Sequence, residues 1–371
     1  MAIKTWIATS PSTWGTAASW SPSGVPTSAD DIVFNGTYNG DCVFAFATIR
    51  SLVMTGYSGI FSGTANMTIS NSDTGTATGN SLVFSSTMTQ SWTGQTTFTS
   101  PVGGYITTNG KSFGALITFN NATGVWRVSD ALQTTALTIT TGNVTFTNNV
   151  TISGSLTLTA GTLTVLNCGN VTIGSQFVSS NTNVRTLNMG CGTWAFSAIG
   201  TPWSLSTSTN MTLNAEQSRI LFTNVSASNC QFQGGGLTYY TFEIARGSGT
   251  GPTTIVGNNT FVNLIDVTST AAHTISLSTS PTTCSVYNFI VRGSPGNLIT
   301  LGRGAAGTYI WQKLGRGVVS KCDYITVISS ITASPVNTWY LGANSAVGTS
   351  VNFIATDAPS SQSLLGSGGV G

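Results

Sequence analysis

The residues from Ala136 to Gly174 constrain the fold more than any other stretch of this chain. They consist of six short blocks in which threonine alternates with apolar residues, separated by Gly, Asn and Ser. The blocks are Leu137–Ile139, Val144–Phe146, Val150–Ile152, Leu156–Leu158, Leu163–Val165 and Val171–Ile173. A period of two is typical of strands that bury one face, and Gly and Asn mark tight turns between them. The pattern leaves no room for helices and predicts a β-solenoid, although a stack of tight hairpins would produce a similar string.

Similar blocks continue over most of the chain and predict an all-β protein. We expect an elongated β-solenoid, with a right-handed parallel β-helix as the favoured form and an aromatic cap at the N-terminal end. Residues 1–40 are predicted to form the cap or a docking segment, 41–335 the solenoid body, and 336–371 a strand pair with a flexible tail. With about 20 to 25 residues in each coil, the body would contain about fifteen coils.

The composition excludes several classes of protein. Charged residues make up 6% of the chain, and hydrophobic residues make up 40%, which does not fit the low hydrophobicity and high charge of disordered chains. The net charge of +2 is too small for a nucleic-acid-binding surface. No run of about 18 apolar residues predicts a membrane span, and the N-terminus lacks a signal peptide. We therefore expect synthesis in a host cytoplasm, no membrane insertion and no nucleic-acid partner.

The cysteines and the single histidine do not form a recognisable metal motif. Zinc sites need ligands at short spacing, and the chain has no CxxC pair, so we expect no metal and no cofactor. We interpret the cysteines as small buried apolar residues in preference to disulfides: Cys42, Cys168, Cys191, Cys230, Cys284 and Cys322. His273 is interpreted as a turn or core residue.

Aromatic residues gather at both ends of the chain. Trp6, Trp14 and Trp20 lie in an irregular segment, where they could cover the open end of a solenoid. Capping or docking is the favoured role for them, and a sugar-binding platform is the alternative. Trp339 and Tyr340 lie near the other end. We predict these five residues as docking or partner-contact residues.

Several phrases of the sequence, in order, resemble parallel β-helix virion proteins of tailed bacteriophages. They are the segments 14–34, 106–113, 124–128, 156–163, 234–240, 322–326 and 339–345. The resemblance implies a virion structural protein such as a tail fibre, a tailspike or a head appendage. It also implies a homotrimer, other capsid or tail proteins as partners, and contact with a host surface glycan. It supplies no catalytic residues.

Enzymatic chemistry has little support in the sequence. Glycoside hydrolysis needs two carboxylates in proximity, whereas Asp30 and Asp31 are neighbours that would point to opposite sides of a strand. The remaining candidates stand apart in the chain: Glu216, Glu243, Asp266 and Asp323. We predict a non-enzymatic protein without catalytic residues, with a polysaccharide-binding or -cleaving β-helix as an alternative.

Pairs of threonines suggest two further alternatives. The pairs Thr138/Thr140, Thr145/Thr147, Thr157/Thr159 and Thr162/Thr164 could align into a hydroxyl array, as in ice-binding solenoids. The simpler interpretation is a solvated strand face, since strands need β-forming residues that are also soluble. A self-assembling extracellular fibre would share the same architecture. The favoured function is a rigid, weakly charged building block of a phage particle.

Overall fold

The chain is almost entirely β-structure. The structure, a computed structural model, describes residues 2–45, 47–72, 79–278, 282–304, 306–328 and 330–359. Parallel strands stack into a β-solenoid of about 13 turns, which confirms the predicted fold class. The number of turns is lower than predicted because some connections are long, such as the one between β33 (Tyr309–Lys313) and β34 (Ile325–Val327).

Strand pairing distinguishes the solenoid from a stack of hairpins. Each strand pairs in parallel with the strand one coil further along, as β4 (Asp31–Phe34) does with β7 (Ser51–Met54). Parallel neighbours need a crossover connection, which here is the rest of the coil. The antiparallel exception is β3 (Trp20–Ser21), which pairs with β1 (Ile3–Trp6). The hand of the coil stays a prediction.

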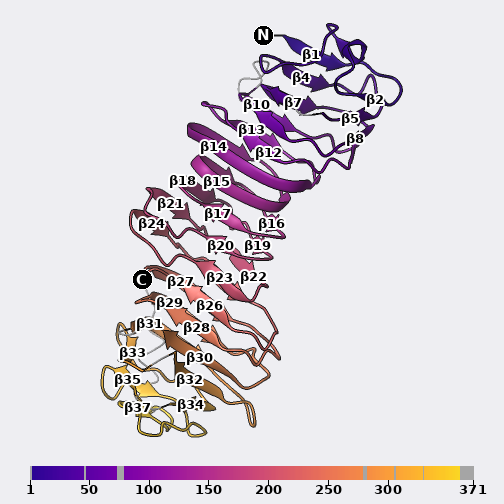
Figure 1. Ribbon diagram of the computed structural model, residues 1–371. Helices are drawn as coiled ribbons and strands as arrows, with labels where there is room; N and C mark the ends of the chain where they lie inside the picture. Colours follow the sequence, from indigo (N-terminus) through magenta and orange to yellow (C-terminus); the bar gives the residue numbers. More distant parts are fainter. Residues whose placement is uncertain are drawn as a thin grey trace. The chain divides into compact units, whose positions relative to one another are not determined.

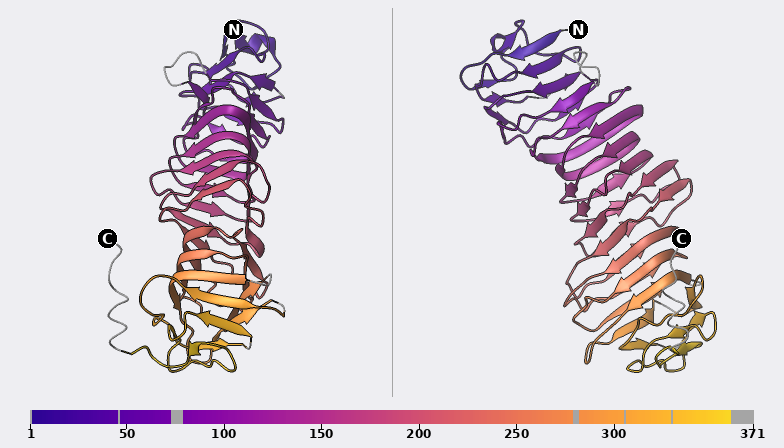
Figure 2. Two further views of the ribbon diagram at one scale, coloured as in Figure 1. Left: turned by 90° about the vertical axis from the view of Figure 1, so that its left-hand side faces the viewer. Right: turned by 180° about the vertical axis from the view of Figure 1, so that it is seen from behind.

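The coils group into two compact units, which we describe one by one. The first unit comprises Met1–Ile173, Asn183–Gly192 and Asn210–Asn214, and the second comprises Gly174–Thr182, Thr193–Thr209 and Ala215–Gly371. Within each unit, successive strands lie one above the next in Figure 1, and both views of Figure 2 show the same stacking.

The first unit has three columns of strands along the sides of its coils. Column A contains β3, β1, β4, β7, β10 (Asn80–Val83), β13 (Gly104–Thr107), the end of β14 (Phe113–Val128), the end of β15 (Leu132–Phe146), β18 (Gly161–Val165), β21 (Arg185–Asn188) and β24 (Met211–Asn214). Column B contains β6 (Ala47–Ile49), β9 (Met67–Ile69), β12 (Thr96–Phe98), the middle of β14 and β15, and β17 (Leu156–Leu158). Column C consists of two sheets: β2 (Ser12–Thr13), β5 (Cys42–Val43), β8 (Ile60–Ser62) and β11 (Thr89–Gln90) form a separate four-stranded sheet, and the start of β14 and β15 pairs with β16 (Val150–Ile152) and β19 (Val171–Ile173).

The second unit is built from two long ladders and a terminal pair. One ladder contains β20 (Phe177–Val178), β23 (Gly200–Ser204), β26 (Cys230–Gln233), β28 (Thr253–Val256), β30 (His273–Ser278), β32 (Ile299–Arg303) and β34. The other contains β22 (Thr193–Phe196), β25 (Arg219–Phe222), β27 (Thr238–Ile244), β29 (Thr260–Asp266), β31 (Thr282–Val291), β33 and β35 (Ile331–Ser334). The predicted last strand pair is present as β36 (Trp339–Tyr340) and β37 (Phe353–Ile354), which pair in parallel.

Alternation along each strand produces the core. In β17 the two leucines are buried and Thr157 between them faces outward, and β16 and β19 repeat this pattern with Val and Ile. Large rings fill the wider coils; in the second unit Phe232 contacts the rings of Trp203, Phe222, Tyr239, Phe242 and Phe261. Such buried area is the main favourable term in stacking the coils.

Two strands are much longer than the sequence pattern predicts. The separate blocks predicted at Leu137–Ile139 and Val144–Phe146 belong to one continuous strand, β15. The chain turns the corner between them at Gly142, whose φ of +101° suits glycine. The parallel pairing of β14 with β15 continues past this corner through register shifts, so the corner counts as strand and not as a turn.

The prediction for the cysteines is wrong for one pair. Cys168 and Cys191 form a disulfide, with their Cα atoms 4.5 Å apart. The two residues are distant in sequence but lie in adjacent coils of the first unit, and sequence spacing alone does not show this proximity. The other four cysteines are buried and free, as predicted: Cys42, Cys230, Cys284 and Cys322.

The parallel ladder begins earlier than residue 41. β1 pairs in parallel with β4, so strands of the solenoid already lie within the segment predicted as a cap. The part of the predicted tail from residue 360 onward lies outside the described residues. Within the described chain, no helix is long and apolar enough to cross a membrane.

Candidate functional site

The three N-terminal tryptophans form one aromatic cluster. The ring of Trp20 lies 5.0 Å from that of Trp6 and 4.8 Å from that of Trp14, and Phe34 stacks on Trp6 at 5.5 Å. All three indoles are buried, with at most 1% of each residue exposed. Trp6 donates its Nε1 hydrogen to the carbonyl of Gly40, and Trp20 donates to that of Trp14. The cluster is therefore the core of the first coils.

β3, which contains Trp20 of this cluster, is the outermost strand of the sheet at its N-terminal end. β3 is the outer neighbour of β1, contains two residues and is followed by Pro22. A short edge strand next to a proline offers few free N–H groups for another strand to pair with. Lys4 reinforces this end by donating its Nζ hydrogens to the carbonyls of Pro22 and Ser23. This arrangement is that of an end cap.

The C-terminal aromatic residues are arranged in a similar way. Trp339 is fully buried, with ring centroids 5.3 Å from Phe289 and 5.7 Å from Phe353, and its Nε1 donates to the carbonyl of Ser334. Tyr340, the next residue on β36, is half-buried.

Burial changes the interpretation of the five predicted contact residues. The four tryptophans belong to the core, because burial of the apolar surface of their indole rings stabilises the coils that contain them. A partner docking at either end would meet the backbone and side chains that cover the rings, and Tyr340 is the member of the set with exposed surface. Docking itself stays a prediction.

The acidic side chains hold turns and neighbouring coils together. Asp30 accepts hydrogen bonds from Thr27, and Asp31, buried beside it, pairs with Arg50 at 3.3 Å and accepts from Ser51. Seven acidic side chains in the described chain accept such bonds: Asp30, Asp31, Asp41, Asp130, Glu243, Asp266 and Asp323. Burial opposes ionisation of Asp30, but the bonds from Thr27 and Ala2 and the charge of Lys4 outweigh it and lower the pKa of this carboxyl.

His273 belongs to a buried polar group with the composition of a catalytic triad but without its geometry. Its Nε2 lies 2.6 Å from Asp266 Oδ2, its Nδ1 lies 3.1 Å from the carbonyl oxygen of Ala271, and Ser269 Oγ donates to Asp266 Oδ1. The serine thus binds the aspartate and not the imidazole, where a nucleophile would have to be. The side chains of His273 and Asp266 are 0% exposed, so no substrate reaches them.

The protonation of His273 follows from its partners. The carbonyl oxygen of Ala271 and the carboxylate of Asp266 are acceptors, so both partners favour the doubly protonated, positively charged imidazole. Burial lowers the pKa of His273, but the hydrogen bond and charge of Asp266 outweigh burial, and the pKa is raised. The pair lies in the core, in line with the predicted core role of the histidine, and it is an ion pair when His273 is protonated.

A column of threonines runs along one face of the first unit. Six threonines occupy matching positions on consecutive strands of column B and pair in register. We call this set the threonine ladder: Thr48, Thr68, Thr97, Thr118, Thr138 and Thr157. Each is half-buried and lies between two buried neighbours, so the ladder is one residue wide on each coil.

The ladder differs from the predicted hydroxyl array. Thr138 aligns with Thr157 in column B, as expected, whereas Thr145 aligns with Thr164 in column A, so the predicted pairs are divided between two columns. Thr147 is buried and donates its hydroxyl to the carbonyl of Val128. The ladder also begins well before Thr138, and the sequence analysis missed this part. The signal was present: each coil contains a threonine between two residues that face inward, as in Met67–Ile69 and Ile117–Phe119.

Within the described ranges, no three His, Cys, Asp or Glu side chains lie close enough together to hold a metal ion. No protein-family model matches the sequence, and neither curated proteins nor solved structures yield a match. The function must therefore be argued from the residues and their arrangement.

Proposed function

We propose that this chain is a non-enzymatic structural protein of a bacteriophage particle. It would serve as a rigid tail-fibre-like, tailspike-like or capsid-decorating appendage, work as a homotrimer attached to other virion proteins, and contact the host surface. Several segments of the sequence resemble phage β-helix proteins in the same order, and this resemblance supports the assignment to a phage particle.

The observation that supports a structural role is that the acidic side chains bind other groups of the chain. A polysaccharide-cleaving β-helix needs carboxylates that are free to meet substrate. Here Asp31, Glu243 and Asp266 bind Arg50, Arg219 and His273, and others cap turns. The pairs of Asp31 with Arg50 and of Glu243 with Arg219 join neighbouring coils, and that of Asp266 with His273 joins consecutive strands, which is what a rigid building block requires.

Two measurements test the proposal. Light scattering coupled to size exclusion should give the mass of a trimer for the purified chain, and mass spectrometry of purified phage particles from the source of the gene should detect it. A monomeric mass would overturn the trimer. Absence from particles that carry the gene would overturn the virion role, and open-ended filaments would support a self-assembling fibre instead.

The threonine ladder favours a second candidate function, ice binding. An uncharged column of methyl and hydroxyl groups repeats once per coil, at the roughly 4.8 Å spacing of neighbouring strands. If it binds ice, Thr97→Glu with Thr118→Glu should abolish thermal hysteresis, whereas Thr212→Glu, at an exposed position outside the ladder, should preserve it. Absence of hysteresis in the unmodified protein would exclude this function.

A further inference from the structure

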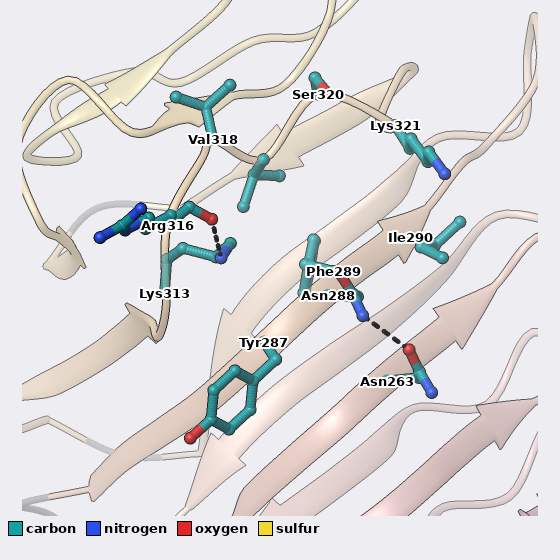
Figure 3. A pocket seen from close by; sticks show the side chains of 11 residues that line it. Asn263, Tyr287, Asn288, Phe289, Ile290, Lys313, Arg316, Val318, Ser320 and Lys321 are labelled. Atoms are coloured by element: carbon teal, nitrogen blue, oxygen red, sulfur yellow. Dashed lines mark hydrogen bonds between the residues drawn. The ribbon is translucent and has the colours of Figure 1, made fainter. Parts of the chain in front are cut away.

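A pocket in the second unit lies where part of one edge of β31 has no paired strand among the described residues. It has a volume of about 350 Å³ and is lined by residues of β29, β31, the end of β33 and the connection that follows β33. The lining residues are Asn263, Tyr287, Asn288, Phe289, Ile290, Lys313, Arg316, Val318, Val319, Ser320 and Lys321. Figure 3 shows the Asn263–Asn288 hydrogen bond on one side of the pocket, and Lys313, Arg316 and Val318 on the other.

The open edge of β31 explains why the pocket exists. On one side, residues 285–291 pair with β29, whereas on the other β33 pairs only with residues 282–286. Within the described chain, no strand or bridge pairs with residues 287–290 on that second side. The connection after β33 does not pair with this edge as a strand, although the thiol of Cys322 donates to the carbonyl of Phe289, and residues 287–290 border the pocket.

The pocket is closed along the strand direction and walled by an anchored segment. Leu314 donates its N–H to the carbonyl of Val286 at one end, and Gly293 donates to that of Asp323 at the other. Val319, in the wall, donates to Thr338 and accepts from Tyr340. An extended peptide could not run through a pocket closed in this way, but a small molecule could enter from outside.

The charges of the lining favour an anion. Lys313, Arg316 and Lys321 contribute three cationic side chains, and none of the eleven lining residues is acidic. Lys313 is 9% exposed, and its Nζ donates to the carbonyls of Leu314 and Arg316. Burial lowers the pKa of Lys313, because no carboxylate among the lining residues compensates its charge. An oxoanion would supply that compensation through charge-assisted hydrogen bonds.

Uncharged groups around the cations suit a polar ligand. Asn288 donates one amide hydrogen to Asn263, which itself donates to Thr241; an amide has a second donor and a carbonyl oxygen with two acceptor sites. Tyr287 is 44% exposed and presents an aromatic ring at the rim. The volume is within the range of small-molecule sites.

We propose that this pocket binds the carboxylate or phosphate group of a small polar molecule about the size of a monosaccharide. Arg316 and Lys321 attract the anionic group, Lys313 compensates it inside the pocket, and the asparagines and Tyr287 bind the polar body. The inference is independent of the virion role, because it concerns binding by the isolated chain.

Titration calorimetry on the full chain tests the site with three probes: glucuronate, inorganic phosphate and glucose. We expect saturable binding of glucuronate or phosphate and none of glucose. Binding of phosphate alone would assign the site to a phosphate group, and binding of glucuronate alone to an acidic sugar; either result supports an oxoanion site. Equal binding of glucose, or no saturable binding of either anion at a Kd of about 10 mM or tighter, would overturn the proposal.

Variants locate the binding within the chain. Arg316→Gln with Lys321→Gln changes two exposed side chains and should weaken anion binding at least tenfold, and Ser320→Asp, in the exposed wall, should weaken it similarly by repulsion. The matched control is Lys111→Gln with Arg127→Gln in the first unit, which removes the same charge and should leave binding unchanged. Equal affinity of all variants, or equal loss in the control, would place the anion elsewhere and refute the site.

Discussion

Replacing Trp20 with alanine tests whether the N-terminal aromatic cluster is a cap or a contact surface. The indole is 1% exposed, lies between the rings of Trp6 and Trp14, and donates to the carbonyl of Trp14. Truncation of a buried tryptophan costs about 3–5 kcal/mol. Since 1.4 kcal/mol corresponds to a factor of ten, the opening equilibrium of the first coils should rise by about 10² to 4 × 10³.

The effect should be local, because each coil of a solenoid contacts only its neighbours. Hydrogen exchange followed by mass spectrometry should show faster exchange in β1, β4 and β7. Peptides from β29 and β31, in the second unit, should exchange at the original rate. Ile3→Ala is the matched control, because Ile3 lies on β1 with 57% of its surface exposed and should change exchange little.

Two results would refute this reasoning. Unchanged exchange in β1 and β4 after Trp20→Ala would mean that the indole is not part of the core. A uniform rise through both units would mean that the solenoid opens as one cooperative block and that the cap has no local role.

Three further predictions concern the pH response, one glycine and the disulfide. The raised pKa of His273 means that its pair with Asp266 stabilises fully below the ordinary value of 6.5, and that this stability is lost as pH rises through the folded-state pKa. The protection of β29 and β30 against exchange, relative to the intrinsic exchange rate at each pH, should therefore fall as pH rises above neutral, and His273→Gln should flatten this dependence. Gly161→Ala should lower the melting temperature more than Gly110→Ala, although both glycines have positive φ. The new Cβ at position 161 would lie 2.1 Å from the carbonyl oxygen of Gly142, whereas the Cβ at position 110 would meet nothing within 4 Å. An equal loss in both variants would show that space at position 161 is not limiting. Thiol labelling of the denatured, unreduced protein should modify four of the six cysteines, and six after reduction; six labelled thiols before reduction would contradict the Cys168–Cys191 bond.

Much of the fold follows from local pattern. The triplets of column B, such as Leu137–Ile139 and Leu156–Leu158, were predicted as strands because an alternating pattern buries one face whatever lies next to it. The free buried state of Cys42 and Cys284 was predictable for a similar reason, since isolated small apolar residues without nearby ligands belong in a core.

The candidate sites were less predictable, because they depend on which coils become neighbours. The aromatic ends were visible in the sequence, but the direction of the tryptophan rings was not. The threonine ladder required knowledge of coil length, since a pair such as Thr68 and Thr97 aligns only once the register is known. The pocket beside β31 exists because part of one strand edge is unpaired in the described chain. A sequence pattern predicts which segments form strands, but it does not show which strand edges stay unpaired.

The sequence by itself thus determined that this chain forms short parallel-compatible strands with an apolar interior and a polar, weakly charged exterior. Period-two alternation is a local property of the chain and needs no partner to be recognised. Only the tertiary structure decided which groups meet: Cys168 with Cys191 and Lys313 with the open edge of β31 across coils, and His273 with Asp266 between two consecutive strands. These contacts depend on the length of every intervening turn, because one residue more or less in a coil moves each later side chain to a different position.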